Sequence, residues 1–192
     1  MRDRRAGRRA SASSWTLAPG CQQRTTPTRW RSGWHRNRGS CTPTTIPGPT
    51  LARDGDTPTG SVHIVDLPDP AAARAFAFDG PNYQAGVYRD VLLRRWRNML
   101  GRTMWDFPGG RTGGNRYLVL GLGTGPAASL AVPADQDELV AYGPLLSDNG
   151  ATWLGTAVLV RARDPDTARA VLTPDRYAGV EVRSWQFGGR PS

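Results

Sequence analysis

The stretch DPAAARAF (69–76) returns, little changed, as DPDTARAV (164–171), 95 positions further along the chain. In both copies an aspartate stands before a proline and a run of alanines and other helix-compatible residues. Aspartate is a preferred N-cap, and proline suits the first position of a helix. Both stretches therefore predict a helix that begins at the same kind of cap, and they raise the question of whether a larger unit is repeated around them.

The similarity extends well beyond the helix start. At the constant offset of 95, residues 55–75 and 150–170 share nine identities in 21 columns, where ordinary composition gives about one or two by chance. After each helix the tripeptide AGV recurs, at 85–87 and at 178–180, and a tryptophan follows downstream. An internal repeat explains this agreement in register. The alternative is that any two strand–Asp-Pro–helix units look alike.

The apolar pattern predicts an order of elements along the chain. β-branched and apolar runs predict strands, and the two capped stretches predict helices. The expected strands cover 60–67, 85–96, 116–122, 155–162 and 178–185, the expected helices cover 69–78 and 164–172, and a short helical turn runs into a strand within 135–146. From residue 116 onward this is the β-α-β-β-α-β order of ferredoxin-like folds. We expect an α+β protein with a ferredoxin-like antiparallel sheet and helices on one face, in two tandem units.

The first quarter of the chain differs in composition from the rest. Residues 1–50 hold ten arginines and one acid, whereas residues 51–192 hold fifteen arginines and fifteen acids, and the whole chain lacks lysine. The first segment also has few aliphatic residues, so we expect it to lack a core and to be disordered. The predicted organisation is a disordered basic arm (1–50), a partial unit (51–107), a glycine-rich linker (108–115) and a second unit (116–188). We also expect that removing residues 1–50 costs little stability.

Composition also limits the class of protein. No stretch is apolar enough for a membrane span, and neither pair of arginines near the N-terminus is followed by the apolar region of a secretion signal. The two cysteines, Cys21 and Cys41, both lie in the arm, so they are weak evidence for a disulfide scaffold. We expect a cytoplasmic protein without a membrane partner and without a cofactor or metal.

The segment YGPLLSDNGATWLGTAVLVRARDPDTARAVLTPDRYAGVEVRSW (142–185) resembles the C-terminal two-thirds of a YCII-related domain. That family shows a Gly-Pro-Leu, a glycine and a strand, a helix, a turn similar to DPY, and a last strand that ends near a tryptophan. Here Gly143-Pro144-Leu145 and TPDRYAGV (173–180) occupy those places. The stretch GPNYQAGVY (80–88) gives the first unit a similar ending, whereas nothing in residues 1–50 resembles the family.

The resemblance implies a fold and a type of site. It implies a ferredoxin-like fold that pairs as a dimeric α+β barrel, so we expect the two tandem units of this chain to pair with each other as an α+β barrel. It also implies a His–Asp site in a cleft. One branch of the family dehydrochlorinates chlorinated hydroxyquinones, and many members have no known reaction. The family's acid matches Asp175 in the second unit, beside Arg176 instead of a proline, and falls next to Asp79 in the first unit. The family's histidine has no match on a first helix, because His35 and His63 are the only histidines in the chain.

We predict His63, Asp79 and Asp175 as catalytic residues if the protein is an enzyme. His63 should face away from Val62 and Ile64 on its strand, where it either lines a cleft beside Asp79 or is an ordinary residue of the sheet face. Four aromatic residues are predicted to form the walls of a substrate pocket, with packing in the core as the alternative. They are Tyr83, Trp96, Trp105 and Trp185.

The predicted function is the binding of a small molecule of unknown identity in a cleft between the two units, with acid–base catalysis of a lyase or isomerase type left open. The alternative is a binding or regulatory module without chemistry. A more distant alternative is nucleic-acid binding through the arginine-rich arm, by neutralisation of phosphates. Assembly of several copies is also open, because single-unit relatives pair their sheets between chains.

Overall fold

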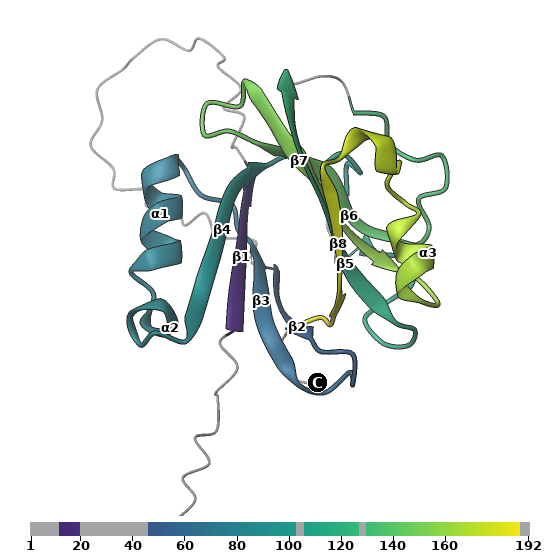
Figure 1. The fold of residues 1–192 in the computed structure, drawn as a ribbon, viewed down its shortest axis with the longest axis horizontal. Coiled ribbons are helices and arrows are strands. Elements are labelled where there is room, and N and C mark those ends of the chain that lie inside the picture. The colour runs from purple at the N-terminus through teal and green to yellow at the C-terminus, as the bar shows by residue number, and fades with distance from the viewer. Residues whose placement is uncertain (1–11, 20–45, 103–105, 127–129, 189–192) are drawn as a thin grey trace, which may run out of the picture.

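The computed structural model describes residues 12–19, 46–102, 106–126 and 130–188 (Figure 1). The first half contains β1 (Ala12–Pro19), β2 (Ile46–Leu51), β3 (Pro58–Ile64), α1 (Pro70–Phe78), α2 (Pro81–Gln84) and β4 (Tyr88–Trp96). The second half contains β5 (Arg116–Pro126), β6 (Leu139–Leu146), β7 (Thr152–Arg161), α3 (Pro165–Arg169), the short 3-10 turn η2 (Pro174–Arg176) and β8 (Gly179–Trp185). The chain is therefore an α+β protein, as the sequence predicts.

The strands form a closed barrel in the order β1-β3-β2-β8-β5-β7-β6-β4. Within the second half the order β8-β5-β7-β6 is antiparallel throughout, and α3 connects β7 to β8 across the intervening β5. This is the split β-α-β arrangement of ferredoxin-like folds. In the first half the corresponding order is β4-β1-β3-β2, with α1 in the connection from β3 to β4. Helix α1 and helix α3 lie outside the barrel, on opposite sides of it (Figure 1).

Strand β1 departs from the antiparallel pattern. It pairs in parallel with β3 and with β4, whereas its counterpart β5 is antiparallel to both neighbours. Strands β3 and β4 run in the same direction because a helical crossover connects them. A strand between them must therefore pair with both in the same sense, and in this chain that sense is parallel.

Two stretches of the predicted disordered arm are strands. β1 and most of β2 lie within residues 1–50. β1 pairs along its length with β4 and in part with β3, and β2 pairs along its length with β3. For these two stretches the structure describes strands where the sequence predicts disorder, because pairing with distant strands supplies what their composition lacks. The remainder of the arm, residues 1–11 and 20–45, lies outside the described residues.

The two predicted N-caps are confirmed. Asp69 has an extended backbone, and its side chain accepts a hydrogen bond of 2.8 Å from the Ala72 N–H at the start of α1. Asp164 has the same conformation and accepts one of 2.7 Å from the Thr167 N–H at the start of α3. Helix α3 ends at Arg169, earlier than expected, and the helical turn expected in 135–146 is absent from the described part of that segment, which forms a turn and then β6.

The two halves meet at two short junctions of similar construction. β4 pairs with β6 through Arg95 and Trp96, and β2 pairs with β8 through Thr50 and Leu51. At the first junction the Arg97 N–H donates to the Pro144 carbonyl oxygen, and at the second the Gln186 N–H donates to that of Pro49. A buried tryptophan and a glycine stand at each place, Trp96 with Gly143 and Trp185 with Gly48.

One apolar core fills the barrel between the halves. Val62 and Ile64 of the first half join residues of β5, β6 and β7 in this core, together with Trp96, Trp185 and Phe107. A second core lies under α3 and includes Val119, Val158, Ala168 and Leu172. Phe107 directly precedes the predicted linker (108–115), so the chain is anchored in the barrel core just before that linker.

Candidate functional site

His63 lies on the outer face of the barrel, beneath helix α1. Its neighbours Val62 and Ile64 face the shared core, so alternation along β3 places His63 on the opposite side. The imidazole meets the Phe76 ring of α1 edge to face, with ring centroids 5.7 Å apart. This orientation confirms that His63 faces away from Val62 and Ile64, and it shows that the residue does not point into the barrel.

A short row of polar side chains surrounds this histidine. Its Nε2 lies 3.1 Å from the Ser61 hydroxyl, which in turn lies 3.1 Å from the Tyr88 hydroxyl. The Nδ1 atom is buried and has no hydrogen-bond partner among the described residues. Burial lowers the pKa of His63 below its ordinary value, because desolvation disfavours the imidazolium. The ring is therefore neutral at pH 7 and has one nitrogen without a partner.

The two predicted catalytic carboxylates stand apart from this row. Asp79 is exposed at the C-terminus of α1, and Asp175 is exposed in η2 of the other half. No hydrogen bond or ion pair joins either of them to His63 in the described part of the chain. The structure thus pairs His63 with neither Asp79 nor Asp175. The catalytic role of the three residues stays a prediction.

The predicted aromatic walls have different environments. Trp96 and Trp185 are almost fully buried at the two junctions, and Trp96 donates a 3.1 Å hydrogen bond from Nε1 to the Gly143 carbonyl oxygen. Tyr83 is exposed on α2, where its ring packs edge to face on Phe78 with centroids 5.0 Å apart. Trp105 lies outside the described residues. Trp96 is therefore placed to pack the junction, whereas Trp185 also borders a pocket.

That pocket lies at the β2–β8 junction and has a volume of about 620 Å³. The first half contributes residues from Leu51 to Gly55, the linker contributes residues 111–115, and β8 with the residues after it contributes residues 184–187. Three arginines line it, Arg53, Arg111 and Arg116, against one acid, Asp54. The sequence analysis missed these residues, although arginines on both sides of a glycine-rich stretch are the signal that could have found them.

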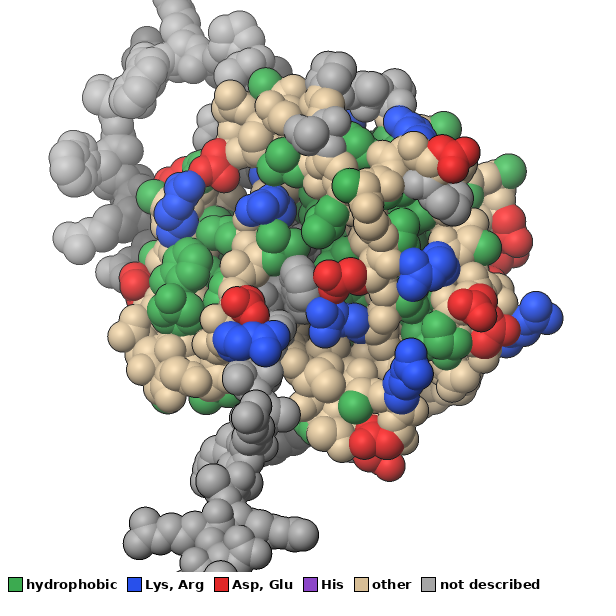
Figure 2. Space-filling view, viewed as in Figure 1, with side chains coloured by type: hydrophobic (Ala, Val, Ile, Leu, Met, Phe, Trp, Pro, Cys, Tyr) green, Lys and Arg blue, Asp and Glu red, His purple; other side chains and the backbone are tan. Residues whose placement is uncertain are grey.

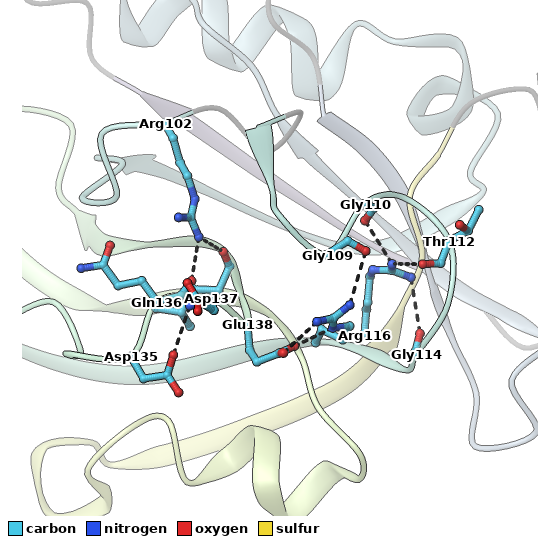
Figure 3. A network of polar contacts seen from close by, with 12 residues as sticks. Arg102, Gly109, Gly110, Thr112, Gly114, Arg116, Asp135, Gln136, Asp137 and Glu138 are labelled. Atoms are coloured by element: carbon cyan, nitrogen blue, oxygen red, sulfur yellow. Dashed lines mark hydrogen bonds and ion pairs between the residues drawn. The ribbon is translucent and has the colours of Figure 1, made fainter.

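Arg116 organises the linker beside this pocket (Figure 3). Its guanidinium donates hydrogen bonds to the carbonyl oxygens of Gly110, Thr112 and Gly114, at 3.2, 3.2 and 3.4 Å. Nearby, Arg161 forms a bidentate ion pair with Glu138 and donates to the Gly109 carbonyl oxygen. The loop is thus wrapped around one guanidinium and held at its start by another.

A second pocket, of about 990 Å³, adjoins the first across Leu51, Arg53, Tyr117 and Ser184. Its other arginines are engaged, since Arg183 pairs with Glu181 at 2.9 Å and Arg169 donates to the Val180 carbonyl oxygen at 2.6 Å. Such pairing is common on this protein, and basic and acidic side chains lie side by side over much of the face drawn in Figure 2. The first pocket therefore differs from the second in how its arginines are paired, and it is not the larger of the two.

Other kinds of site receive no support from the described residues. They contain no group of three or more histidine, cysteine, aspartate or glutamate side chains placed to hold a metal ion. None of the helices in the described ranges is both long enough and apolar enough to cross a membrane.

Comparison with known proteins gives one finding. Residues 7–97 match the family model of the YCII-related domain. The match spans the segment from β1 to β4, which is the first half of the barrel. It includes residues 7–50, in which the sequence analysis finds no resemblance, so the interpretation of the first unit as truncated is not supported. No curated protein and no solved structure matches the chain.

Proposed function

From the YCII-related domain in residues 7–97, we propose that this is a YCII-like protein of two units that binds a small molecule in the cleft between them. The second unit is proposed from the strand order shared by the two halves and from the matching caps at Asp69 and Asp164. In this proposal the two units pair within one chain, as single-unit relatives pair between chains.

One observation carries the binding proposal. The pocket at the β2–β8 junction is lined by residues of both halves, has a volume in the range of small-molecule sites, and combines aromatic side chains with arginines. Trp185, Tyr117 and Phe187 supply apolar surface there. A concave site between two structural units, with convergent polar groups, is where ligand binding is expected.

A thermal-shift screen of small polar molecules, confirmed by calorimetric titration, tests this proposal. Ser184 lines the pocket, so Ser184→Phe should fill it and abolish the binding of any ligand found. Thr173→Phe is the matched control, because Thr173 is exposed and does not line this pocket. The proposal fails if no ligand is found, or if a ligand binds the Ser184→Phe variant as tightly as it binds the wild type.

Acid–base catalysis is a second candidate, favoured by the neutral, half-buried His63 and its row of Ser61 and Tyr88. A neutral imidazole with a free nitrogen can accept a proton from a substrate. If the protein turns over a ligand found in the screen, His63→Ala should abolish turnover, and Asp79→Asn and Asp175→Asn should reduce it. Unchanged turnover in the His63 variant would leave the binding module without chemistry as the better proposal.

A further inference from the structure

We infer that the pocket at the β2–β8 junction binds its ligand through an oxyanion, either a carboxylate or a phosphate. The inference rests on the proposed function, since it names the chemical class of the small molecule. It follows from the unequal pairing of charges around the pocket, and it assigns Arg53 and Arg116 as the residues that hold the anion.

Arg116 supplies a buried positive charge without a carboxylate. The side chain is only 8% exposed, and its hydrogen bonds all go to neutral backbone carbonyl oxygens. Its Nε atom is buried and has no partner among the described residues. Burial and the nearby Arg161 lower the pKa of Arg116, in keeping with a cation that lacks an acidic neighbour. A buried charge of this kind is stabilised by a ligand of opposite charge.

Arg53 approaches the same pocket from the first half of the barrel. It is exposed, and its side chain has no hydrogen-bond or ion-pair partner within the described ranges. The adjacent Asp54 is occupied by its own turn, where it accepts hydrogen bonds from the N–H groups of Asp56 and Thr57 and from the Thr57 hydroxyl. These bonds hold the pKa of Asp54 below its ordinary value, so the carboxylate is already satisfied. The Arg53 guanidinium is therefore available for a ligand.

The pocket wall holds a second buried donor without a partner. The Trp185 Nε1 atom is buried and makes no hydrogen bond in the part of the chain that the structure describes, although the corresponding atom of Trp96 donates to Gly143. Buried donors are satisfied in the great majority of cases. Trp185 Nε1 lies against Gly48 of β2, so the unpartnered donor that favours a ligand with hydrogen-bond acceptors is Arg116 Nε.

The neighbouring pocket provides an internal contrast. There Arg183 is paired with Glu181, and Arg169 is bonded to a carbonyl oxygen. In the first pocket Arg116 donates only to backbone carbonyl oxygens, and the one acid, Asp54, is occupied by its own turn. The uncompensated charge thus lies at the β2–β8 junction, and the oxyanion is assigned there.

Calorimetric titration of the full chain with phenyl phosphate, benzoate and neutral benzamide tests the inference. At least one of the two anions should bind about tenfold or more tightly than benzamide, because charge-assisted hydrogen bonds are roughly twice as strong as neutral ones. Whichever anion binds more tightly distinguishes a phosphate from a carboxylate ligand. Raising the salt concentration should weaken the binding of the anion but leave that of benzamide unchanged.

Arg53→Gln should weaken the binding of the preferred anion by about tenfold. Arg97→Gln is the matched control, since Arg97 is an exposed arginine with no side-chain partner among the described residues and does not line this pocket. Equal binding of benzamide and the anions, or equal loss in both variants, overturns the oxyanion while leaving small-molecule binding intact. If none of the three probes binds but an uncharged ligand from the screen binds and is excluded by Ser184→Phe, the oxyanion inference alone is wrong.

Discussion

His63 and Arg116 show how burial gives side chains of ordinary types unusual properties. His63 is held between β3 and α1, where desolvation lowers its pKa and leaves Nδ1 without a partner. Arg116 is held inside a loop whose carbonyl oxygens accept hydrogen bonds from Nη1 and Nη2 but leave Nε without a partner and the charge without a carboxylate. The environment of His63 comes from a separate helix and that of Arg116 from the loop directly before it, so neither property follows from the residue type alone.

The lowered pKa of His63 predicts a pH dependence of stability. Between the lowered pKa of the folded state and the ordinary value of about 6.5, the unfolded chain binds a proton that the folded chain does not. The free energy of unfolding should therefore be fully retained above about pH 6.5 and should decrease as the pH falls below that value. Thermal melts of the wild type and of His63→Gln between pH 7.5 and pH 5.5 check this, since the wild type should lose more of its melting midpoint.

A His35→Gln variant serves as the control for this measurement, because His35 and His63 are the two histidines of the chain. It should keep the pH dependence of the wild type. If His63→Gln shows the same fall as the wild type, the imidazole is not responsible for it.

The alternation of β3 predicts the outward direction of His63 from the sequence, because a strand has a period of two and Val62 and Ile64 are apolar. The pocket arginines could not be predicted in the same way. An arginine beside a glycine-rich stretch is usually solvated, and Arg116 is buried only because β5 continues directly from the loop that encloses it. Likewise, the expected meeting of His63, Asp79 and Asp175 depended on a cleft whose walls only the three-dimensional arrangement defines.

At the scale of the elements, local signals were predictable and strand partners were not. The Asp-Pro caps lie within one turn of the helices they begin, so both are visible in the sequence. β2 is harder to recognise, because IPGPTL contains two prolines, which lack the N–H that a ladder needs. This composition suits a strand that pairs fully on one side with β3 and meets β8 at Thr50 and Leu51 on the other.

The two junctions depend on glycines that no other residue can replace. At Gly143 an added Cβ would overlap the Arg97 carbonyl oxygen and would lie 3.1 Å from the Trp96 Nε1 atom. The backbone there is held by the hydrogen bond from the Arg97 N–H to Pro144, so neither partner can move without losing it. The close approach of β4 to β6 therefore requires a residue without a side chain.

We predict that Gly143→Ala destabilises the protein by about 3 kcal/mol, in the upper range for an overpacked site. Gly179→Ala is the control in a strand of the same barrel, because no atom lies within 4 Å of the Cβ that it would add. Its effect should stay within about 0.5 kcal/mol. Denaturant unfolding measures both changes, and similar values for the two variants would contradict the assigned role of Gly143.

At the scale of the whole molecule, closure of the barrel joins residues from both ends of the sequence. β1 lies between β3 and β4, and β2 lies between β3 and β8, so the second strand of the chain pairs directly with the last one. The repeat and the element order predict the two units, and the family resemblance predicts their pairing as a barrel. It does not predict β1 and β2, because their residues show no apolar pattern and their stability comes from partners far along the chain.

This arrangement reverses the expected effect of removing residues 1–50. The deletion eliminates β1 and most of β2, and with them the pairing of Thr50 to Trp185 and the partly buried hydrogen bond between the Thr50 and Thr59 hydroxyls. The sheet would then lose its closure, and β3, β4 and β8 would each gain an unpaired edge. We predict a melting midpoint lower by roughly 10 °C or more, the change that a loss of several kcal/mol gives in a chain of this size.

Deletion of residues 1–11 is the control, since it ends before β1 and should leave the midpoint within a few degrees of the wild type. A small effect of the longer deletion would show that β1 and β2 contribute little to the barrel, and the original expectation for this segment would then be correct.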